Sequence, residues 1–523
     1  MTVAAPRFSI VTPVFDPPAR ALEEMIDSVR SQTFGDWELI LVDDRSTQAH
    51  VLPILRGAAE ADARIRVIER ADNGHIVRAS NDGIEAARGE FVVLVDHDDL
   101  LVDVALERMA AAIDAEPEAD YLYSDEDKVD DDGNLYDRFR KPDWSPERLR
   151  GQMYTSHLSV LRTSLVREVG GFHEGFDGSQ DHDLVLRVTE RARRVVHVPE
   201  VLYHWRVVPG SAAGDPEAKP YAWTAGKNAV QAHLERCGID ATADYGPVPG
   251  TYTVERHARP DGLVSVIIPT RGGEGIVWGE RRVFVVEAVR SLLRHAGDVD
   301  LEVVVVYDGV TPPAVLDELR AVAGEKLLLV RYDKPFNYSE KCNIGALRSH
   351  GRWLVMLNDD VEVVTPRFVQ RLVAPLLEEG VGMTGARLLF PDGTLQHAGV
   401  VYRRGDPGHA YYGDFDDELG VANALVLDRE CSALTGACMA MSRKVFDQVG
   451  GFSELLPVNF NDTDLSLKVA ACGLRLVWLH AAKAFHFESK TRVAVVHAWE
   501  HELLKSRWPS RPRDPYMPAE RAV

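Results

Sequence analysis

The chain has 523 residues, of which 45% are hydrophobic and 27% are charged, and its formal net charge is −22. This length exceeds what one hydrophobic core usually supports, so we expect two to four domains. The acidic balance disfavours nonspecific binding to nucleic acid and broad electrostatic docking on anionic lipid, because both depend on basic patches.

Strands and helices alternate from the start of the chain. Short β-rich runs predict strands at Phe8–Val14, Glu38–Val42, Ile65–Ile68 and Phe91–Val95. The helical spacing of apolar residues predicts helices at Leu22–Gln32, Val51–Ala61 and Ile76–Ala87. This alternation is typical of an α/β fold, in which helices cover a mostly parallel sheet.

The same order of features returns in the second half of the chain. Val264–Pro269 matches Phe8–Pro13, and the run Leu301–Val306 ends in Tyr307-Asp308, where the first copy has Asp43-Asp44. Self-similarity at this long period indicates tandem domains. Because Gly and Pro cluster at 245–262, we predict one domain over 1–255 and a second over 256–492. A C-terminal helix and tail over 493–523 then follow, with the helix at Val493–Trp508.

Each copy has an apolar run that ends in acids, at 89–99 and again at 351–362. In an open parallel sheet, ligands bind beyond the carboxyl ends of the strands. We therefore expect the acids at the predicted strand ends to share one crevice: Asp43, Asp44, Asp96, Asp98 and Asp99. Carboxylates spaced in this way suit Mg²⁺ or Mn²⁺ bound together with phosphate oxygens. An isolated motif of this kind is more often a solvated turn or helix cap, but the second copy favours a function.

A second pair of acids opens an apolar helix in each copy, at Asp181-His182-Asp183 and at Asp462-Thr463-Asp464. Such an acid can act as a general base on an attacking hydroxyl. It can also cap the helix and complement its dipole. We assign Asp181 and Asp462 to catalysis, and Asp183 and Asp464 to structure.

A metal that binds diphosphate and a separate carboxylate base together fit one reaction, the displacement of a nucleoside diphosphate from a sugar by an acceptor hydroxyl. With the base and the leaving group on opposite faces, the anomeric carbon inverts. A nucleotide-sugar-forming transferase and a dinucleotide oxidoreductase are both disfavoured because Thr12–Asp16 replaces the Gly-rich phosphate loop after the first strand.

These motifs resemble those of tandem-domain family 2 glycosyltransferases of the GT-A fold, which act in bacterial O-antigen, capsule and cell-wall polysaccharide assembly. The resemblance covers roughly 6–215 and 262–492. In the first copy it rests on Val11–Phe15, Val42–Ser46, Asp96–Asp99, Tyr123–Lys128, Gln180–Leu184 and His204–Arg206. The second copy is similar to the rhamnosyltransferase-like branch through Phe336–Asn343, Asn358–Asp360, Leu434–Ala440 and His486–Lys490.

The resemblance implies a role for each matched residue. Asp98 and Asp360 would hold a divalent metal, Mg²⁺ or Mn²⁺, and Asp181 and Asp462 would act as bases. The residues expected to bind the nucleotide diphosphate or to stand beside the metal are Asp43, Asp44, Asp96, His204, Asp308, Asn358 and His486.

The second copy departs from the family pattern at the nucleotide side. Tyr307 replaces the first acid of the Asp-Asp pair, and Asn358 is a weaker metal ligand than Asp96. Two hypotheses follow. Either both domains are active on nucleotide-sugar donors and a saccharide or lipid-linked saccharide acceptor, or one catalytic domain stands beside a degenerate copy that binds carbohydrate or serves as a scaffold.

The chain shows neither a signal peptide nor an apolar stretch of about 18 residues that could span a membrane. We expect a cytoplasmic protein that contacts the inner face of the cell membrane at most peripherally, through a lipid-linked acceptor or the 493–508 helix. For the acceptor itself, we expect contacts from the segment 385–435, where Gln396–Gly399 and Tyr411-Tyr412 are the candidates; this segment could equally be a lid.

Overall fold

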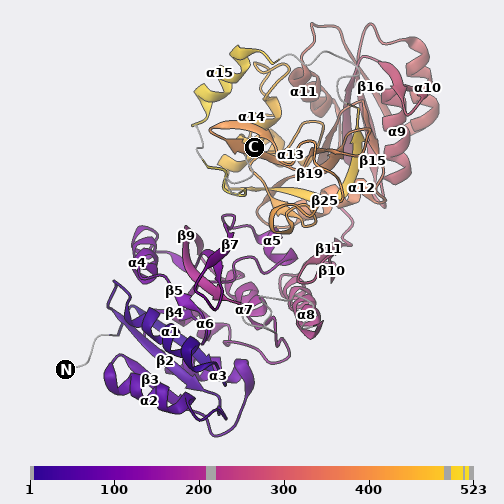
Figure 1. The fold of residues 1–523 in the computed structure, drawn as a ribbon. Coiled ribbons are helices and arrows are strands. Elements are labelled where there is room, and N and C mark those ends of the chain that lie inside the picture. The colour runs from indigo at the N-terminus through magenta and orange to yellow at the C-terminus, as the bar shows by residue number, and fades with distance from the viewer. Residues whose placement is uncertain (1–4, 208–219, 488–495, 510–512, 518–523) are drawn as a thin grey trace. The chain divides into compact units, whose positions relative to one another are not determined.

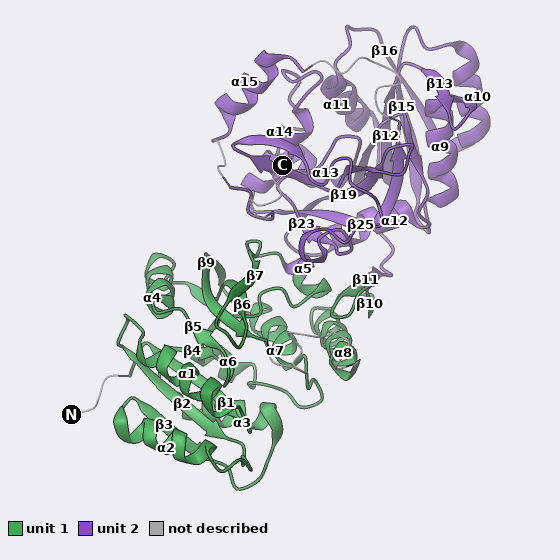
Figure 2. Ribbon diagram, viewed as in Figure 1, with its two compact units in different colours: residues 1–145, 149–254 green, residues 146–148, 255–523 purple. Residues whose placement is uncertain are grey.

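The computed structural model describes residues 5–207, 220–487, 496–509 and 513–517. The chain forms two compact units (Figures 1 and 2). The first comprises 1–145 and 149–254, and the second comprises 146–148 and 255–523. Each unit has its own sheet and its own core.

The first unit is built on a mixed sheet with the strand order β3-β2-β1-β4-β8-β6-β9-β5 and with β7 beside β6. The strands from β3 to β4 run parallel, as do β6 and β9, whereas β8 and β5 run antiparallel to their neighbours. Their bounds are β1 Phe8–Val14, β2 Trp37–Asp43, β3 Ile65–Glu69, β4 Phe91–Leu94, β5 Leu100–Leu101, β6 Ala119–Val129, β7 Leu135–Phe139, β8 Ser159–Arg162 and β9 Arg194–Arg206.

Helices cover both faces of this sheet (Figure 1). On one face, apolar residues of α1 Ala19–Arg30, α2 Val51–Ala61 and α4 Ala105–Ala115 pack against the strands. On the other face the packing comes from α3 His75–Ala86, α6 Thr163–Glu168, α7 Gln180–Thr189 and α8 Pro220–Arg236. The short helix α5 Pro146–Gly151 and the hairpin of β10 Ala241–Tyr245 and β11 Tyr252–Arg256 complete this part of the chain.

The second unit repeats this topology. Its sheet has the order β16-β15-β12-β17-β24-β19-β25-β18, which matches the first sheet position by position. These strands are β12 Val264–Thr270, β15 Leu301–Asp308, β16 Leu327–Tyr332, β17 Trp353–Leu357, β18 Val361–Val363, β19 Val381–Leu389, β24 Cys438–Ser442 and β25 Arg475–His486. Smaller strands are β13 Glu274–Val277, β14 Glu280–Val283, β20 Leu395–His397, β21 Val400–Arg403, β22 Asp406–His409 and β23 Arg429–Glu430.

The helices of the second unit also divide between the two faces of its sheet. One face is covered by α9 Phe284–His295, α10 Pro313–Ala323 and α12 Phe368–Val373. The other is covered by α11 Tyr338–Arg348, α13 Arg443–Gln448 and α14 Asn461–Ala471. The last described helix is α15 Ala498–Arg507, and the 3-10 turns are Gly324–Lys326, Ala374–Leu377 and Val421–Asn423.

The predicted strands and helices of the first copy are confirmed within a few residues at each end. The C-terminal helix predicted at Val493–Trp508 is present as α15, whereas 493–495 lie outside the described residues. Among the helices that the structure describes, none is both long enough and apolar enough to cross a membrane.

A glycine lets one helix approach the central strand closely in each unit. A Cβ atom at Gly83 in α3 would lie 2.4 Å from a methyl carbon of Val11 in β1. The matched Gly345 in α11 would place a Cβ 2.5 Å from Ile267 in β12. Because core packing leaves little room for such an atom, both positions need glycine.

We predict that Gly83→Ala destabilises the first unit by about 1–3 kcal/mol, because the added methyl overpacks the contact between α3 and β1. Urea unfolding followed by circular dichroism measures this change. The control is Gly57→Ala in α2, where a Cβ meets nothing within 4 Å, so the better helix propensity of alanine should stabilise by about 1 kcal/mol. Equal effects at the two positions would contradict the packing argument.

Candidate functional site

The acids at the end of β2 in the first unit are buried and already engaged. Asp44 Oδ1 accepts hydrogen bonds from Arg70 Nη1 at 2.6 Å and from the Gly74 N–H at 2.8 Å. Asp43 Oδ1 accepts one from the Ser46 N–H at 3.2 Å. Asp44 therefore sits in an ion pair that also orders the chain entering α3.

The acid motif after β4 divides into exposed and buried carboxylates. The Asp96 side chain is 49% exposed and that of Asp98 is 21% exposed, whereas Asp99 is buried. Asp99 accepts hydrogen bonds from the Tyr203 hydroxyl and from the Arg206 N–H. Burial raises the pKa of Asp98, and it raises that of Asp99 far more. Asp96 and Asp98 are thus the acids that can meet a ligand, while Asp99 braces the turn.

A histidine that the sequence analysis missed stands beside this motif. The His157 ring stacks on Tyr203 with 4.5 Å between centroids. Its Nδ1 lies 3.3 Å from Glu126 Oε2, and its Nε2 lies 4.0 Å from Asp96 Oδ2. Burial alone would lower the pKa of His157, but Glu126 and the neighbouring aspartates raise it to about 9. The imidazole is therefore a counter-charge inside the acid cluster.

Glu126 is in turn held in its ionised form. Lys141 is fully buried, and its Nζ donates to Glu126 Oε2 at 3.0 Å. Although burial opposes ionisation, Lys141 and His157 lower the pKa of Glu126 to about 2. Lys141 and His157 lie in segments where the sequence analysis found no metal or base motif. The only signal for this region was the resemblance of Tyr123–Lys128 in β6 to the family.

The predicted base of the first unit lies at the start of α7. Asp181 Oδ1 accepts a hydrogen bond from the His182 N–H at 2.9 Å. Burial raises the pKa of Asp181, and the charges of His157 and Asp96 act on it as well. Asp183 is buried instead in an ion pair with Arg187 at 2.6 Å, as expected for a structural acid.

In the second unit, four of the predicted residues, Asn358, Asp360, Asp462 and His486, line one cavity of about 660 Å³, whereas Asp308 is not part of its lining. Its polar wall includes Thr270, Lys341, Asn358, Asp359, Asp360, Asp462 and His486. Asp462 lies at the start of α14, where its two oxygens accept from the Gly436 N–H at 2.9 Å and the Thr463 N–H at 2.7 Å. The structure thus brings the second predicted base and the second acid motif into one space.

An imidazole also stands beside the second acid motif. His486 Nε2 lies 3.1 Å from Asp360 Oδ1 and 3.3 Å from Asn358 Nδ2. The amide oxygen of Asn358 is buried, and no hydrogen-bond partner reaches it within the described parts of the chain. A carboxylate, an amide oxygen without a partner and an imidazole nitrogen form a donor set that fits a divalent cation such as Mn²⁺ or Mg²⁺.

The middle acid of this motif has a different surrounding. Asp359 Oδ2 accepts a hydrogen bond from Thr270 Oγ1 at 2.6 Å. Burial and the adjacent Asp360 raise the pKa of Asp359 to about 7. Asp359 is therefore bound to the central strand β12 rather than to the Asp360–His486 pair.

The departure at Tyr307 is accompanied by a new cation. Lys341 Nζ donates at 2.7 Å to Asp308 Oδ1 and at 2.7 Å to the Thr270 carbonyl. Lys341 comes from α11, whereas the cation on the matched Asp44 comes from Arg70 after β3. Burial lowers the pKa of Lys341.

Part of the segment 385–435 lines the cavity, but the residues named as candidates for acceptor contacts, Gln396–Gly399 and Tyr411-Tyr412, do not. Gln396 and His397 are buried, and Gln396 Oε1 lies 2.7 Å from His486 Nδ1. Gln396 thus holds the imidazole from behind. The cavity is lined instead by the hairpin of β21 and β22, at Val400 and 407–409.

His204 and His486, which the sequence matched to each other, do not occupy equivalent places. The His204 Nδ1 atom pairs closely with a carboxylate oxygen of Asp127. No acid of the 96–99 motif lies within ion-pair distance of His204 among the described residues, whereas His486 is in such contact with Asp360.

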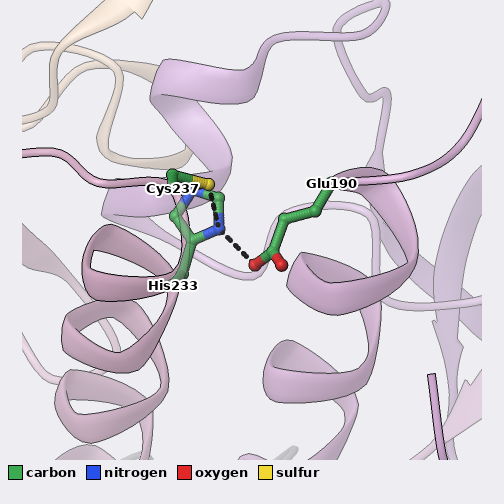
Figure 3. Close-up of side chains that lie close together, drawn as sticks. All are labelled: Glu190, His233 and Cys237. Carbon is green, nitrogen blue, oxygen red and sulfur yellow. Dashed lines mark hydrogen bonds and ion pairs between the residues drawn. The ribbon is translucent and has the colours of Figure 1, made fainter.

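A second group of metal-ligand types occurs in the first unit, away from the acid motif (Figure 3). His233 Nδ1 lies 2.8 Å from Glu190 Oε1, and Cys237 Sγ lies 3.7 Å from the same ring nitrogen. Arg236 donates to both oxygens of Glu190, and Arg150 Nε donates to His233 Nε2. Cations already fill this group, so it ties α7 to α8 rather than holding a metal.

Comparisons with known proteins place the chain among glycosyltransferases. The glycosyl transferase family 2 profile matches residues 9–170 and 265–450. The chain is 42% identical over 494 residues to protein y4gI of Sinorhizobium fredii, covering 93% of this chain and 54% of the relative. It is 37% identical over 520 residues to the O-antigen biosynthesis protein RfbC of Myxococcus xanthus, covering 98% of this chain and 40% of the relative.

The chain therefore spans about half the length, or less, of these two curated relatives. Among solved structures, residues 1–349 of S. aureus TarS in complex with UDP align at 21% identity with a TM-score of 0.34, covering 44% of this chain and 71% of that truncated TarS chain. The family profile covers well over half of the chain in two separate regions that fall one in each unit. The chain belongs to glycosyl transferase family 2 and consists of two tandem GT-A domains.

Proposed function

We propose that this protein is a metal-dependent, inverting glycosyltransferase with two active sites. It would move hexosyl or deoxyhexosyl groups from nucleotide-diphosphate donors to a growing bacterial surface or cell-wall polysaccharide. The observation that carries the proposal is the shared cavity of Asp462, Asp360 and His486, which unites a base candidate with a metal donor set. The similarity to a relative named for O-antigen biosynthesis supports the polymer class.

The residues of the second unit would divide the chemistry between them. A bound Mg²⁺ or Mn²⁺ supplies charge neutralisation on the diphosphate leaving group. Asp360, Asn358 and His486 would hold it. Asp462 would take the proton of the acceptor hydroxyl as its oxygen forms a bond to the anomeric carbon. The bond from that carbon to the diphosphate oxygen breaks, and its electron pair leaves with the nucleoside diphosphate, which inverts the carbon.

The first unit would use Asp181 in the same way, with Asp96 and Asp98 on the metal side. A base is more effective when its pKa lies nearer the working pH. The raised pKa of Asp181 supports this assignment. Asp43, Asp44 and Asp308 would act on the nucleotide side largely through the loops that they order, since Arg70 and Lys341 already engage two of these carboxylates.

The alternative function, one catalytic domain beside a degenerate copy, is supported by two residues of the second unit. Tyr307 and Asn358 replace acids in the second unit, and that unit would then bind acceptor carbohydrate or serve as a scaffold. Calorimetry that detects acceptor binding to the Asp360→Ala protein, together with unchanged products, would favour it. For location, we propose the cytoplasm at the inner face of the membrane, where a lipid-linked acceptor would be presented.

We predict that Asp98→Ala and Asp360→Ala each abolish one glycosidic linkage. Removing a carboxylate from the metal side leaves the diphosphate charge uncompensated at that site alone. The measurement is nucleoside diphosphate release and product linkage with Mn²⁺, a panel of nucleotide sugars and lipid-linked acceptors. Chelation by EDTA should stop both linkages. A full set of products from either variant would show that the mutated unit is not catalytic.

The two proposed bases give a second activity prediction. Asp181→Asn and Asp462→Asn should each lower kcat at their own site by about 10²–10⁴-fold, the usual contribution of general acid–base catalysis. Asp177→Asn, an exposed acid near the start of α7, is the matched control and should leave kcat within two-fold, roughly. A KM effect without a kcat effect would assign Asp181 to binding instead.

The raised pKa of Asp181 also predicts a change in stability. Because the folded-state pKa lies above the unfolded value, the ionised carboxylate destabilises the native state at neutral pH. Asp181→Asn should therefore raise the melting temperature at pH 7, and the gain should vanish as the pH falls to about 4. Differential scanning calorimetry across this range checks the sign, and a loss of stability at pH 7 would contradict it.

A further inference from the structure

The backbone pairing shows how β9 and β25 correspond. The Val102 N–H donates to the Leu202 carbonyl at 3.1 Å, and the Val364 N–H donates to the Lys483 carbonyl at 3.4 Å. Val102 and Val364 stand equally far along the chain from Asp98 and Asp360. Leu202 is therefore the counterpart of Lys483.

Counting on from this pair shifts the matched histidines by one residue. His204 then corresponds to Phe485, and Trp205 corresponds to His486. The ladder agrees, because Leu101 pairs with Tyr203 in the first unit and the matched Val363 pairs with Ala484 in the second. Since neighbouring residues of a strand point to opposite faces, His204 projects away from the face that carries His486 in the second unit.

The first unit supplies an imidazole to the acid motif from another strand. Leu94 pairs with Ser159 in the first unit, as Met356 pairs with Met439 in the second. Two residues before these partners stand His157 and Ala437, so an imidazole in one unit replaces a methyl group in the other.

The side chains at these two matched positions compensate for each other in size. In the first unit, Trp205 fills the position of His486, and its ring lies 5.4 Å from that of His157. In the second unit, the small Ala437 leaves room on that side, and His486 occupies the place of the tryptophan. Each unit therefore has one imidazole and one non-ligating side chain at these two positions.

A side-chain oxygen lies behind the Nδ1 atom of each imidazole, as an ion-pair partner in the first unit and as a hydrogen-bond partner in the second. His157 Nδ1 lies 3.3 Å from Glu126 Oε2, and His486 Nδ1 lies 2.7 Å from Gln396 Oε1. An acceptor behind one ring nitrogen leaves the other nitrogen for a cation, as in carboxylate–histidine–metal arrangements. His157 Nε2 faces Asp96 at 4.0 Å, and His486 Nε2 faces Asp360 at 3.1 Å.

These separations suit a shared ion. Two ligands about 2.1 Å from one cation lie between about 3 and 4.2 Å apart, depending on the angle between them. The ligand atoms of Asp96, Asp99 and His157 all lie within 4.8 Å of one another. Because Tyr203 and Arg206 occupy the oxygens of Asp99, Asp96 and His157 are the two that remain for an ion.

We propose that His157, rather than His204, is the imidazole ligand of the divalent cation in the first unit, with Asp96 beside it and Glu126 as its positioning residue. This inference rests on the proposed function of the site.

The test uses Mn²⁺ alone as the probe and the full chain with the second site silenced by Asp360→Ala and His486→Ala. Electron spin-echo envelope modulation of the bound Mn²⁺ should show nitrogen coupling in this background. Adding His157→Ala should abolish the coupling and weaken Mn²⁺ binding by about ten-fold or more. Adding His204→Ala should leave both within two-fold, roughly.

The outcomes separate the inference from the proposed function. Coupling that survives His157→Ala and disappears in His204→Ala would overturn the inference while keeping the metal site. Bound Mn²⁺ without any nitrogen coupling would also overturn it. Failure of the background protein to bind Mn²⁺ would sink the proposed metal dependence as well. The melting temperature of each variant shows whether it folds, and His157→Gln is a second variant in case His157→Ala does not. The nitrogen coupling expected in the background protein is measured with His157 intact, so it does not depend on the folding of either variant.

Discussion

The gathering of carboxylates at the carboxyl ends of buried parallel strands is the constraint on which both units depend. Burying an ionised acid costs several kcal/mol unless a cation or hydrogen-bond donors reach it. In this fold, individual buried carboxylates have their own cation or hydrogen-bond donor. Arg70 pairs with Asp44, Lys341 pairs with Asp308, and Tyr203 donates to Asp99. Asp96, Asp98 and Asp360 have no arginine, lysine or tyrosine on their side chains among the described residues, and they are the carboxylates that can bind a ligand.

The two units share a topology but differ in the cations that balance their acids. Strand order and helix placement repeat closely, because they follow from apolar patterns that tolerate many substitutions. The balancing group needs only a positive charge within reach, and it can come from any neighbouring element. Arg70 after β3 and Lys341 in α11 are two such solutions, and His157 and His486 are two more.

The sequence predicts the elements that follow from apolar patterns, but it does not predict which groups balance the buried charges. Periodicity predicted β1 to β4 and their helices, and the repeated motifs placed Asp96, Asp360 and both helix-start acids at the ends of the right elements. The sequence pattern could not reveal His157 or Gln396, because their positions beside the acids depend on pairing between strands that are distant in the chain. Matching His204 to His486 looked sound in sequence, but a one-residue difference in strand register turns a side chain to the other face.

The same balance of charge bears on whether the second site has decayed. A site that loses its function loses acids without compensation, since nothing selects a partner for them. In the second unit the acid missing at Tyr307 is accompanied by Lys341 on Asp308, and the weaker ligand Asn358 is accompanied by His486 on Asp360. Gln396 is buried behind that imidazole, and its hydrogen bond at 2.7 Å fixes the direction of the ring. Rebalanced charges of this kind support two working sites with different chemistry around the diphosphate.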